Sequence, residues 1–374
     1  MEYINKAKVY TYLIVLMLNI LSSNAQNILS EFSYEEGDTI VISKQVDLRG
    51  EKLNLPKNII LKFEKGGCLK NGTIIANNAF IIGCKNEIFD SIKVAGQWNV
   101  KYISTDMFKD ITSLNSLQNV FALASEKVNN VITVAEGNYE VAASHNGNTI
   151  LSVPSNTEVI INGTITMIPN DYTNYYIVGL KGENIQLHGK GEIVGDKHTH
   201  IGTKGEWGMG VNLANCKNVD IYDLTIRDCW GDCIYIGTKS TNVRINNCTL
   251  DHGRRQGISI TSAGTVLIEN CVISNVGGTA PEYAIDVEPN KNDTVDSVII
   301  RNVKSIDCKG GFLTWGGAKN CVIKNVELYD CYVEGASKPD YAFNTSYSIK
   351  VINCASNRDY KPINNKCKSF KVEK

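Results

Sequence analysis

The sequence predicts an all-β fold, a single-stranded parallel β-helix in which short strands repeat along the chain as a solenoid. The first observation is a repeated motif, Ile-x-Asn/Asp followed by Leu, Cys or Val. Its copies begin 24, 23, 32, 23 and 28 residues apart, at Ile221, Ile245, Ile268, Ile300, Ile323 and Val351. A near-constant period of this length indicates one supersecondary unit per repeat. The second observation is that each unit holds several short alternating segments and no helix. This pattern favours stacked strands, about 4.8 Å apart.

The beginning of the chain has the pattern of a secretory signal peptide. Lys6 and Lys8 precede an apolar run over residues 10–21, and residues 23–25 are small or polar at the cleavage position. The run is too short for a membrane anchor, and no cysteine lies near the cleavage point for lipid attachment. We therefore expect a secreted or periplasmic protein with no membrane span, cleaved after Ala25.

Between this segment and the solenoid the chain changes character twice. Strand-like segments punctuated by Gly and Asn predict a separate β-rich region, and a stretch with apolar residues at helical spacing (Leu117, Val120, Phe121) predicts a helix. A helix in that place would cover the open end of a solenoid. The predicted segments are a signal peptide (1–25), a β-rich region (26–105), a capping helix (106–130), the parallel β-helix (131–357) and a polar tail (358–374).

Of the twelve cysteines, six are placed at two repeat positions, and at the first of these other repeats have Leu or Val. One such position is predicted to hold Cys248, Cys271 and Cys354, and a second to hold Cys229, Cys308 and Cys331. Cysteine that alternates with aliphatic residues is typical of small buried side chains in an internal stack. We expect reduced structural thiols, since no CxxC motif with matching His residues points to a metal. At a turn of the same repeats, asparagines are expected to form a structural ladder, at residues 247, 270, 302, 325 and 353.

One strand of each repeat is expected to carry a row of outward-facing side chains. Strand side chains alternate, so a polar residue between two aliphatic ones faces solvent. The predicted row is Asn212, Tyr235, Ser259, Asp286, Thr314 and Asn344. The residues two positions earlier are mostly small, so a shallow groove should lie beside this row, which suits a sugar chain. Tyr235 would line that groove, and Trp207, Trp230 and Trp315 are candidate stacking platforms.

The strongest candidate for chemistry is a charged cluster on adjacent repeats. Asp286 and Glu288 lie on one face of a strand, about 6.6 Å apart, where mutual repulsion raises one pKa and provides a general acid or base. The preceding insertion, SNVGGTAPEYA, would form a wall beside them. The preceding repeat supplies His252, Arg254, Arg255 and Gln256, and arginine binds carboxylates in a bidentate manner. The alternative is structural: Asp286 and Glu288 pair with these arginines and fix the insertion in place.

Residues 131–345 resemble the pectin-lyase-like superfamily of right-handed parallel β-helices. The segments ENIQLHGKGEIVG, GDCIYIG and QGISI carry this resemblance. It implies a three-sheeted prism, commonly with a polysaccharide-binding cleft along one sheet.

Two branches of this superfamily suggest roles for individual residues. Polygalacturonases have a GDDC motif and, one coil later, GHG, where this chain has WGDC and RQG. Asp232 therefore matches one family carboxylate, but Gly231 and Gln256 replace its partner and the histidine. Alginate lyases and epimerases place Tyr three residues before Asp and His two residues after it. Tyr283 and Asp286 match that pattern, with Glu288 in place of the histidine.

The sequence thus favours a secreted carbohydrate-active enzyme that cleaves a polysaccharide, one containing uronic acid by the resemblance and the arginines. Asp232, Tyr283, Asp286 and Glu288 are the expected catalytic residues, by hydrolysis or elimination. Substrate contacts are expected from Tyr235, His252, Arg254, Arg255, Gln256 and Trp207. The alternative is a noncatalytic glycan-binding or adhesive β-helix.

No cofactor is signalled, although Asp286 and Glu288 are oxygen ligands that would suit calcium. The pair His198 and His200 lies on a long insertion expected over the same sheet, where it would cap the cleft, and two histidines by themselves are a weak metal signal. A formal net charge of −1 gives no support for nucleic-acid binding. Nothing in the sequence indicates an oligomeric state.

Overall fold

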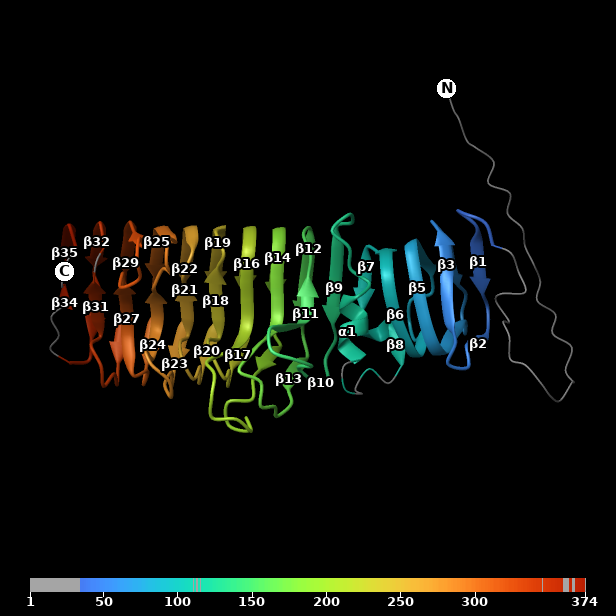
Figure 1. Cartoon of the computed structure of the whole chain (residues 1–374), viewed down its shortest axis with the longest axis horizontal. Coiled ribbons are helices and arrows are strands. Elements are labelled where there is room, and N and C mark those ends of the chain that lie inside the picture. Colours follow the sequence, from blue (N-terminus) through green and yellow to red (C-terminus); the bar gives the residue numbers. More distant parts are fainter. Residues whose placement is uncertain are drawn as a thin grey trace, which may run out of the picture. The chain divides into compact units, whose positions relative to one another are not determined.

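The structure, a computed structural model, describes residues 34–109, 111, 114, 116–344, 346–358, 363–364 and 367–373 (Figure 1). The predicted signal peptide lies outside the described residues. Among the helices within them, none has both the length and the apolar character needed to cross a membrane. The chain divides into two compact units, one formed by residues 1–99 and 107–109 and the other by residues 100–106 and 110–374.

The first unit contains a sheet of seven strands whose neighbours pair in parallel. Its apolar side chains alternate along the strands, so Ile74, Ile81 and Val94 are buried. The strands are β1 (Thr39–Ile42), β2 (Gln45–Asp47), β3 (Lys52–Lys57), β4 (Ile60–Phe63), β5 (Cys68–Gly83), β6 (Phe89–Asn99) and β8 (Phe108–Lys109).

The second unit is a parallel β-helix, which confirms the predicted fold class. Each coil adds one strand to a nine-stranded sheet and the rest to a larger, bent sheet. The nine strands are β10 (Asn138–Val141), β13 (Thr164–Met167), β15 (Glu192–Val194), β17 (Thr225–Arg227), β20 (Thr249–Asp251), β23 (Val272–Ser274), β26 (Lys304–Ile306), β30 (Tyr332–Glu334) and β33 (Ala355–Ser356).

The larger sheet turns a corner within each coil. In β14 and β16 the strand is continuous across the corner, whereas later coils divide it into two strands. Its first strands are β7 (Tyr102–Ser104), β9 (Asn130–Val134), β11 (Asn148–Val153), β12 (Thr157–Ile161), β14 (Asn174–His188) and β16 (Trp207–Tyr222). The divided coils contain β18 (Ile234–Gly237), β19 (Ser240–Asn246), β21 (Ile258–Ile260), β22 (Ala263–Glu269), β24 (Tyr283–Val287) and β25 (Thr294–Arg301). The last coils contain β27 (Gly310–Trp315), β28 (Val322–Ile323), β29 (Asn325–Tyr329), β31 (Tyr341–Asn344), β32 (Ser348–Ile352), β34 (Ile363–Asn364) and β35 (Ser369–Glu373).

Within the predicted capping segment, residues 106–130, the structure has one short α-helix among the described residues, so the predicted extent of the helix was wrong. Helix α1 (Ser116–Phe121) buries Leu117, Val120 and Phe121 and packs on β10 and β11 of the second unit. A single 3₁₀ turn, η1 (Thr105–Met107), precedes it. At the other end the ladder continues past residue 357, because β35 pairs in parallel with β32.

The interior of the second unit is a set of aliphatic rows, one residue per coil. Ile221, Ile245 and Ile268 stack in register, and each is fully buried. A buried aliphatic side chain of this kind stabilises the fold by about 1.5–3 kcal/mol. The row continues with Ile300, Leu328 and Val351.

This row corrects one predicted repeat. The motif copy at Ile323 is not equivalent to the others, because Ile323 pairs with Val295 and Leu328 pairs with Ile300. The true copy is Leu328-Tyr329-Asp330-Cys331, in which Leu replaces the expected Ile. Leucine fills the same interior space, so the backbone register follows burial and not the identity of the first residue.

The predicted outward row also needs a correction. In the coil after Asp286, the outward residue is Leu313, one position before the predicted Thr314. Asp286 pairs with Leu313, which in turn pairs with Ala342, whereas Thr314 pairs with Val287 and is buried. Asn344 is level with Trp315. Thr314 is tolerated inside because its hydroxyl forms a hydrogen bond with Ser346 Oγ at 3.1 Å. The outward row is therefore Asn212, Tyr235, Ser259, Asp286, Leu313 and Ala342.

All twelve cysteines are free thiols, and most are buried. Cys331 does not share a position with Cys229 and Cys308; it stands where the earlier coils have Cys248 and Cys271, and the two thiols Cys331 and Cys354 interact. The same five-residue shift that moves the repeat to Leu328 explains this change.

The asparagine ladder is exposed and depends on a left-handed backbone. Asn270 has a φ of 56°, donates to Asn246 Oδ1 at 2.9 Å and accepts from Asn302 Nδ2 at 2.8 Å. Asn325 is not part of it, since it lies in β29; Asp330 takes that position, with a φ of 53°. Asparagine tolerates this conformation better than other residues with a Cβ.

We expect Asn270→Gly to lower the free energy of unfolding by about 1 kcal/mol, because only side-chain hydrogen bonds are lost. Asn270→Ala should cost about 1 kcal/mol more, since alanine is strained at positive φ. Urea unfolding measures both. At Asn325, in ordinary strand conformation, alanine should be no worse than glycine, and the opposite result would contradict the assignment.

Candidate functional site

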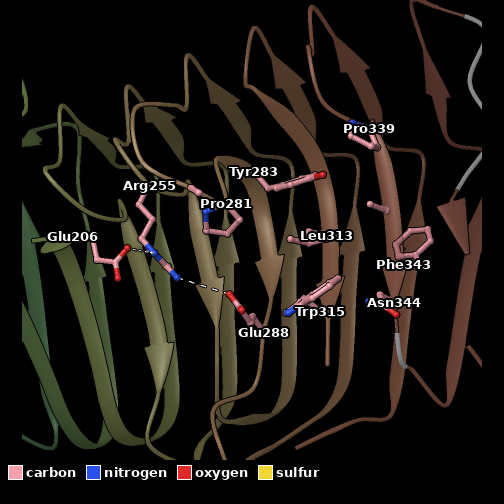
Figure 2. Close-up of a pocket in the computed structure, with 12 residues that line it drawn as sticks. Glu206, Arg255, Pro281, Tyr283, Glu288, Leu313, Trp315, Pro339, Phe343 and Asn344 are labelled. Atoms are coloured by element: carbon pink, nitrogen blue, oxygen red, sulfur yellow. Dashed lines mark ion pairs between the residues drawn. The ribbon is translucent and has the colours of Figure 1, made fainter. Parts of the chain in front are cut away.

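A pocket of about 560 Å³ opens on the second unit where the insertion follows β23 (Figure 2). We call it the Arg255 pocket. Its polar lining residues are Glu206, Arg255, Tyr283, Glu288 and Asn344, and its apolar ones include Pro281, Leu313, Trp315, Pro339 and Ala342. We call the turn between β23 and β24, residues 275–282, the wall; it is the central part of the predicted insertion, residues 274–284, and its Ala280 and Pro281 border the pocket. The wall is held on one side by Thr279, whose N–H donates to Arg254 O at 2.9 Å.

Arg255 is the centre of the site, and each of its three guanidinium nitrogens faces a carboxylate. Nε lies 3.5 Å from Glu206, Nη1 lies 3.3 Å from Asp232, and Nη2 lies 3.8 Å from Glu288. Nη1 also donates to Ser259 Oγ at 3.2 Å. Burial by itself lowers the pKa of Arg255, but the surrounding carboxylates outweigh it and raise the pKa.

Asp232 lies under this guanidinium and is fully buried. Burial raises the pKa of Asp232 to about 6, against the opposing effect of the Arg255 charge. The tight turn around Gly231 holds it there, because a Cβ at Gly231 would meet Glu206 O at 2.5 Å. Asp232 therefore orients Arg255 from below and has no surface of its own toward the pocket.

Asp286 is also buried, although it belongs to the outward row. Its Oδ2 accepts a hydrogen bond from Gln256 Nε2 at 2.7 Å, and Gln256 Oε1 accepts from Tyr283 N at 2.7 Å. Among the described residues, its Oδ1 has no hydrogen-bond donor. Burial, followed by the neighbouring Glu288 charge, raises the pKa of Asp286 well above its ordinary value. Burial beside Glu288 thus favours the protonated form of Asp286.

Glu288 and Tyr283 are the predicted catalytic residues that reach the pocket itself. The Glu288 side chain is 35% exposed, compared with 1% for Asp286. Burial and the Asp286 charge raise the pKa of Tyr283, so its phenol stays a hydrogen-bond donor at neutral pH. Tyr235 lies two coils earlier in the outward row, where its hydroxyl accepts from Thr261 Oγ1 at 2.8 Å.

Arg254 does not join Arg255 in the pocket. Its Nη1 donates to Gly205 O at 2.9 Å, and its guanidinium stacks over the Trp230 ring at 3.7 Å. Trp230 is buried between this guanidinium and the ring of His200, so it has a packing role. Trp207 is 45% exposed but is not one of the residues that line the Arg255 pocket.

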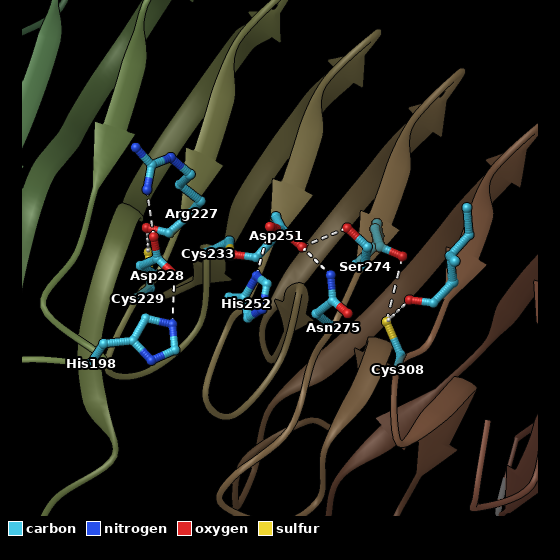
Figure 3. Close-up of polar contacts among 12 residues, drawn as sticks. His198, Arg227, Asp228, Cys229, Cys233, Asp251, His252, Ser274, Asn275 and Cys308 are labelled. Atoms are coloured by element: carbon cyan, nitrogen blue, oxygen red, sulfur yellow. Dashed lines mark hydrogen bonds and ion pairs between the residues drawn. The ribbon is translucent and has the colours of Figure 1, made fainter. Parts of the chain in front are cut away.

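His252 lies only three residues before Arg255 but lines a different pocket, with Asn275 and Lys309. Its Nδ1 is 2.6 Å from Asp251 Oδ2, and His198 contacts it edge-on while bonding Asp228 at 3.0 Å (Figure 3). The turn after β20 thus directs His252 and Arg255 into two different pockets. The structure brings together Asp232, Arg255, Gln256, Tyr283, Asp286 and Glu288, and separates from them His252, Arg254 and Trp207.

The carboxylates of the Arg255 pocket surround a guanidinium, which occupies the place that a cation would need. Across the described residues, no group of three or more His, Cys, Asp or Glu side chains is arranged to hold a metal ion. Calcium binding at Asp286 and Glu288 stays a hypothesis. His200 is buried against Asp196, at 2.8 Å, and does not cap a cleft.

The pocket residues that were not predicted from the sequence include Glu206 and Leu313. Glu206 lies in the insertion directly before β16. It reaches the pocket only because that loop ends beside it, and the sequence does not show where the loop ends. Leu313 faces outward only in the corrected register, because Phe312 and Thr314 are both 1% exposed. The sequence signal for this register was the pair of large aromatic side chains Phe312 and Tyr341, which stack inside at 5.4 Å between ring centroids.

A family model described as "Right handed beta helix region" matches residues 130–325 and 210–362. The chain belongs to this family of right-handed parallel β-helix proteins, which confirms the resemblance to the pectin-lyase-like superfamily.

Two relatives from Bacillus subtilis (strain 168) are similar in sequence. Uncharacterized protein YclG is 32% identical over 276 residues, which is 64% of this chain and 45% of YclG. The SPbeta prophage-derived uncharacterized protein YorA is 26% identical over 299 residues, 71% of this chain and 50% of YorA. The chain spans about half the length of these curated relatives.

Among solved structures, an exopolygalacturonase from Thermotoga maritima has 16% identity and a TM-score of 0.48, covering 71% of this chain and 78% of that one. An alginate lyase from Paenibacillus sp. str. FPU-7 has 14% identity and a TM-score of 0.45, covering 73% and 99%. At these identities the likeness concerns the fold alone.

We expect Asp232 to make stability fall as the pH rises. The folded state holds this proton up to a pH of about 6, whereas an unfolded aspartate loses it near 3.8, so stability decreases between those values and is constant above them. The loss amounts to about 3 kcal/mol. Urea unfolding of the parent and Asp232→Asn proteins from pH 4 to 7 should show this difference. Parallel pH profiles would contradict the buried, proton-binding carboxyl.

Gln256→Leu should destabilise the protein, because it leaves Asp286 Oδ2 and the Tyr283 N–H buried without partners. Each such group costs about 1–3 kcal/mol. The matched control is Gln186→Leu at an exposed glutamine, with an expected change within about 0.5 kcal/mol. Equal unfolding midpoints for the two variants would show that Gln256 is not the bridge.

Proposed function

We propose that the protein is a carbohydrate-active enzyme that cleaves a polysaccharide in the Arg255 pocket. The observation that carries this proposal is the carboxyl pair Asp286 and Glu288, in which one member is buried, so that its protonated form is favoured, and the other is exposed in the pocket. Such a pair supplies a general acid to a pocket at neutral pH. A pocket on one face of a β-helix, bordered by an exposed tryptophan, suits a sugar chain.

Hydrolysis uses this arrangement in the following way. The proton held by Asp286 and Glu288 passes through Glu288 to the glycosidic oxygen as its bond to the anomeric carbon breaks. Water adds to that carbon, and its proton passes to Glu206, the second carboxylate that faces the pocket. Arg255 lies between the two glutamates and keeps them apart in fixed orientations. Asp232 and Gln256 are positioning residues, since they contact Arg255 and Asp286 from within the protein.

Elimination is the second chemical route for the same residues. It needs a base near the proton beside a uronate carboxylate and a group that protonates the leaving oxygen. Glu288 and Tyr283 can take these two roles. A uronic-acid-containing substrate, which Arg254 and Arg255 led us to expect, is accordingly one of the polysaccharides to be tested.

A noncatalytic glycan-binding protein is the alternative function. Trp315, which is 44% exposed, and the apolar side of the pocket suffice for binding without any chemistry. Export of the protein, expected from residues 1–25, stays a prediction in either case.

The test is the double variant Asp286→Asn, Glu288→Gln. It should keep its unfolding midpoint and its retention on a polysaccharide that the parent cleaves, and lose product formation by about 10²–10⁴-fold. Glu269→Gln is the matched control, because Glu269 pairs with Arg244 away from the pocket and should leave the rate unchanged. New reducing ends without the ultraviolet absorbance of unsaturated uronates would indicate hydrolysis, and that absorbance would indicate elimination. A parent that retains polysaccharides but forms no product supports the noncatalytic alternative.

A further inference from the structure

We infer that the glycan of the Arg255 pocket is electrically neutral and carries apolar substituents, such as O-acyl or 6-deoxy groups, and is not a polyuronate. This inference rests on the proposed function only in taking the pocket as a glycan site. It requires no particular chemistry there. Two independent observations carry it: the Arg255 guanidinium already faces three protein carboxylates, and the outward row becomes apolar.

The first observation concerns the two arginines that a uronate would use. All three nitrogens of the Arg255 guanidinium lie within 4 Å of protein carboxylates. Arg254 is directed away, to Gly205 O and the Trp230 ring. Recognition of a carboxylate by arginine is strongest with two free, parallel N–H groups. In Arg255, Nη1 is bonded to Asp232 and Ser259, and Nε is buried without a hydrogen-bond partner among the described residues. A uronate would therefore have to compete with Glu288 for Nη2, which lies 3.8 Å from that carboxylate.

The balance of charge in the pocket adds to this effect. Glu206 and Glu288 face the pocket and Asp232 lies beneath it, against the single positive charge of Arg255. The net charge around the guanidinium is therefore negative. A second carboxylate brought into a partly buried site of this kind is repelled, so each uronate residue would weaken binding.

The second observation is the change of character along the outward row. From Asn212 to Asp286 the row is polar, and with Leu313 and Ala342 it becomes apolar. Leu313 and Ala342 both line the pocket and are partly exposed. The step from Ser259 to Ala342 crosses three coil spacings, about 14 Å, so both halves are within reach of one short sugar chain.

Apolar groups close this half of the pocket from three directions. Trp315 stands beside Leu313 on the same face of β27, Pro281 comes from the wall, and Pro339 precedes β31 (Figure 2). Hydroxyl groups placed there would lose water without gaining hydrogen bonds. A methyl or acyl group gains from burial, and one buried methyl corresponds to about fourfold in affinity.

The experiment measures retention of the intact protein by matched pairs of polysaccharides in affinity electrophoresis. One pair is an O-acetylated glucomannan and the same batch after alkaline deacetylation; the other is polygalacturonate and its methyl ester. We expect the acetylated and the methyl-esterified member to retain the protein at least about fourfold more strongly. Equal or stronger retention by the unsubstituted members, or no retention by any of the four, would overturn the inference.

Variants separate the two observations. Glu288→Gln frees Nη2 of Arg255 and removes one negative charge, so retention by polygalacturonate should rise. Leu313→Asn should remove the preference for the acetylated glucomannan, and Trp315→Ala should weaken both glucomannan forms. Tyr102→Ala, at an exposed aromatic residue on β7 outside the pocket, is the matched control and should change nothing. An unchanged preference in both Leu313→Asn and Trp315→Ala contradicts the apolar site.

Failure of this inference and failure of the proposed function give different results. If the parent cleaves polygalacturonate as readily as its methyl ester, the enzyme assignment stands and the substrate class is wrong. If the substituted glycans are preferred but no product forms, the substrate class stands and the noncatalytic function applies.

Discussion

Backbone pairing between successive coils is the constraint on which the rest of the structure depends. In β21, β24 and β27 each residue is matched one for one with its neighbour in the next coil. A slip of one residue would exchange the two faces of a strand, placing Ile285 in solvent and Asp286 in the interior. The arrangement of the pocket is thus fixed by peptide hydrogen bonds to which the side chains of Asp286 and Glu288 contribute nothing.

Much of the fold could be predicted because burial repeats with the coil. The period, the strand pattern and the carboxyl pair before β25 all follow from rows such as Ile221, Ile245 and Ile268. The repeat after Ile300 was predicted at the wrong residue because two segments resemble the motif. The segment at Ile323, Ile-x-Asn-Val, matches the motif residue for residue, whereas the true copy begins with Leu328. The interior position is filled according to the volume of the side chain, and a sequence motif does not describe volume.

The members of the site were harder to predict than the fold, since contacts across turns are not periodic. Gln256 was placed near Asp286, but its bridge to the Tyr283 backbone spans 27 residues and depends on the path of the wall. Arg254 and Arg255 are adjacent and alike in sequence, but only Arg255 enters the pocket. Arg254 turns away because its guanidinium stacks on the Trp230 ring. Glu206, the third carboxylate that faces Arg255, comes from a loop that is distant in sequence.

The wall over residues 275–282 is an outgrowth of one turn between β23 and β24, fastened to Arg254 on one flank and to Lys338 on the other. No pairing of β23 with β26, or of β24 with β27, passes through it. Changes in its outer part leave this strand pairing intact, whereas Val276 and Gly277 bond to the neighbouring coils. A scaffold of this kind can acquire new selectivity by remodelling the outer part of a single loop, while the strand pairing on either side is kept.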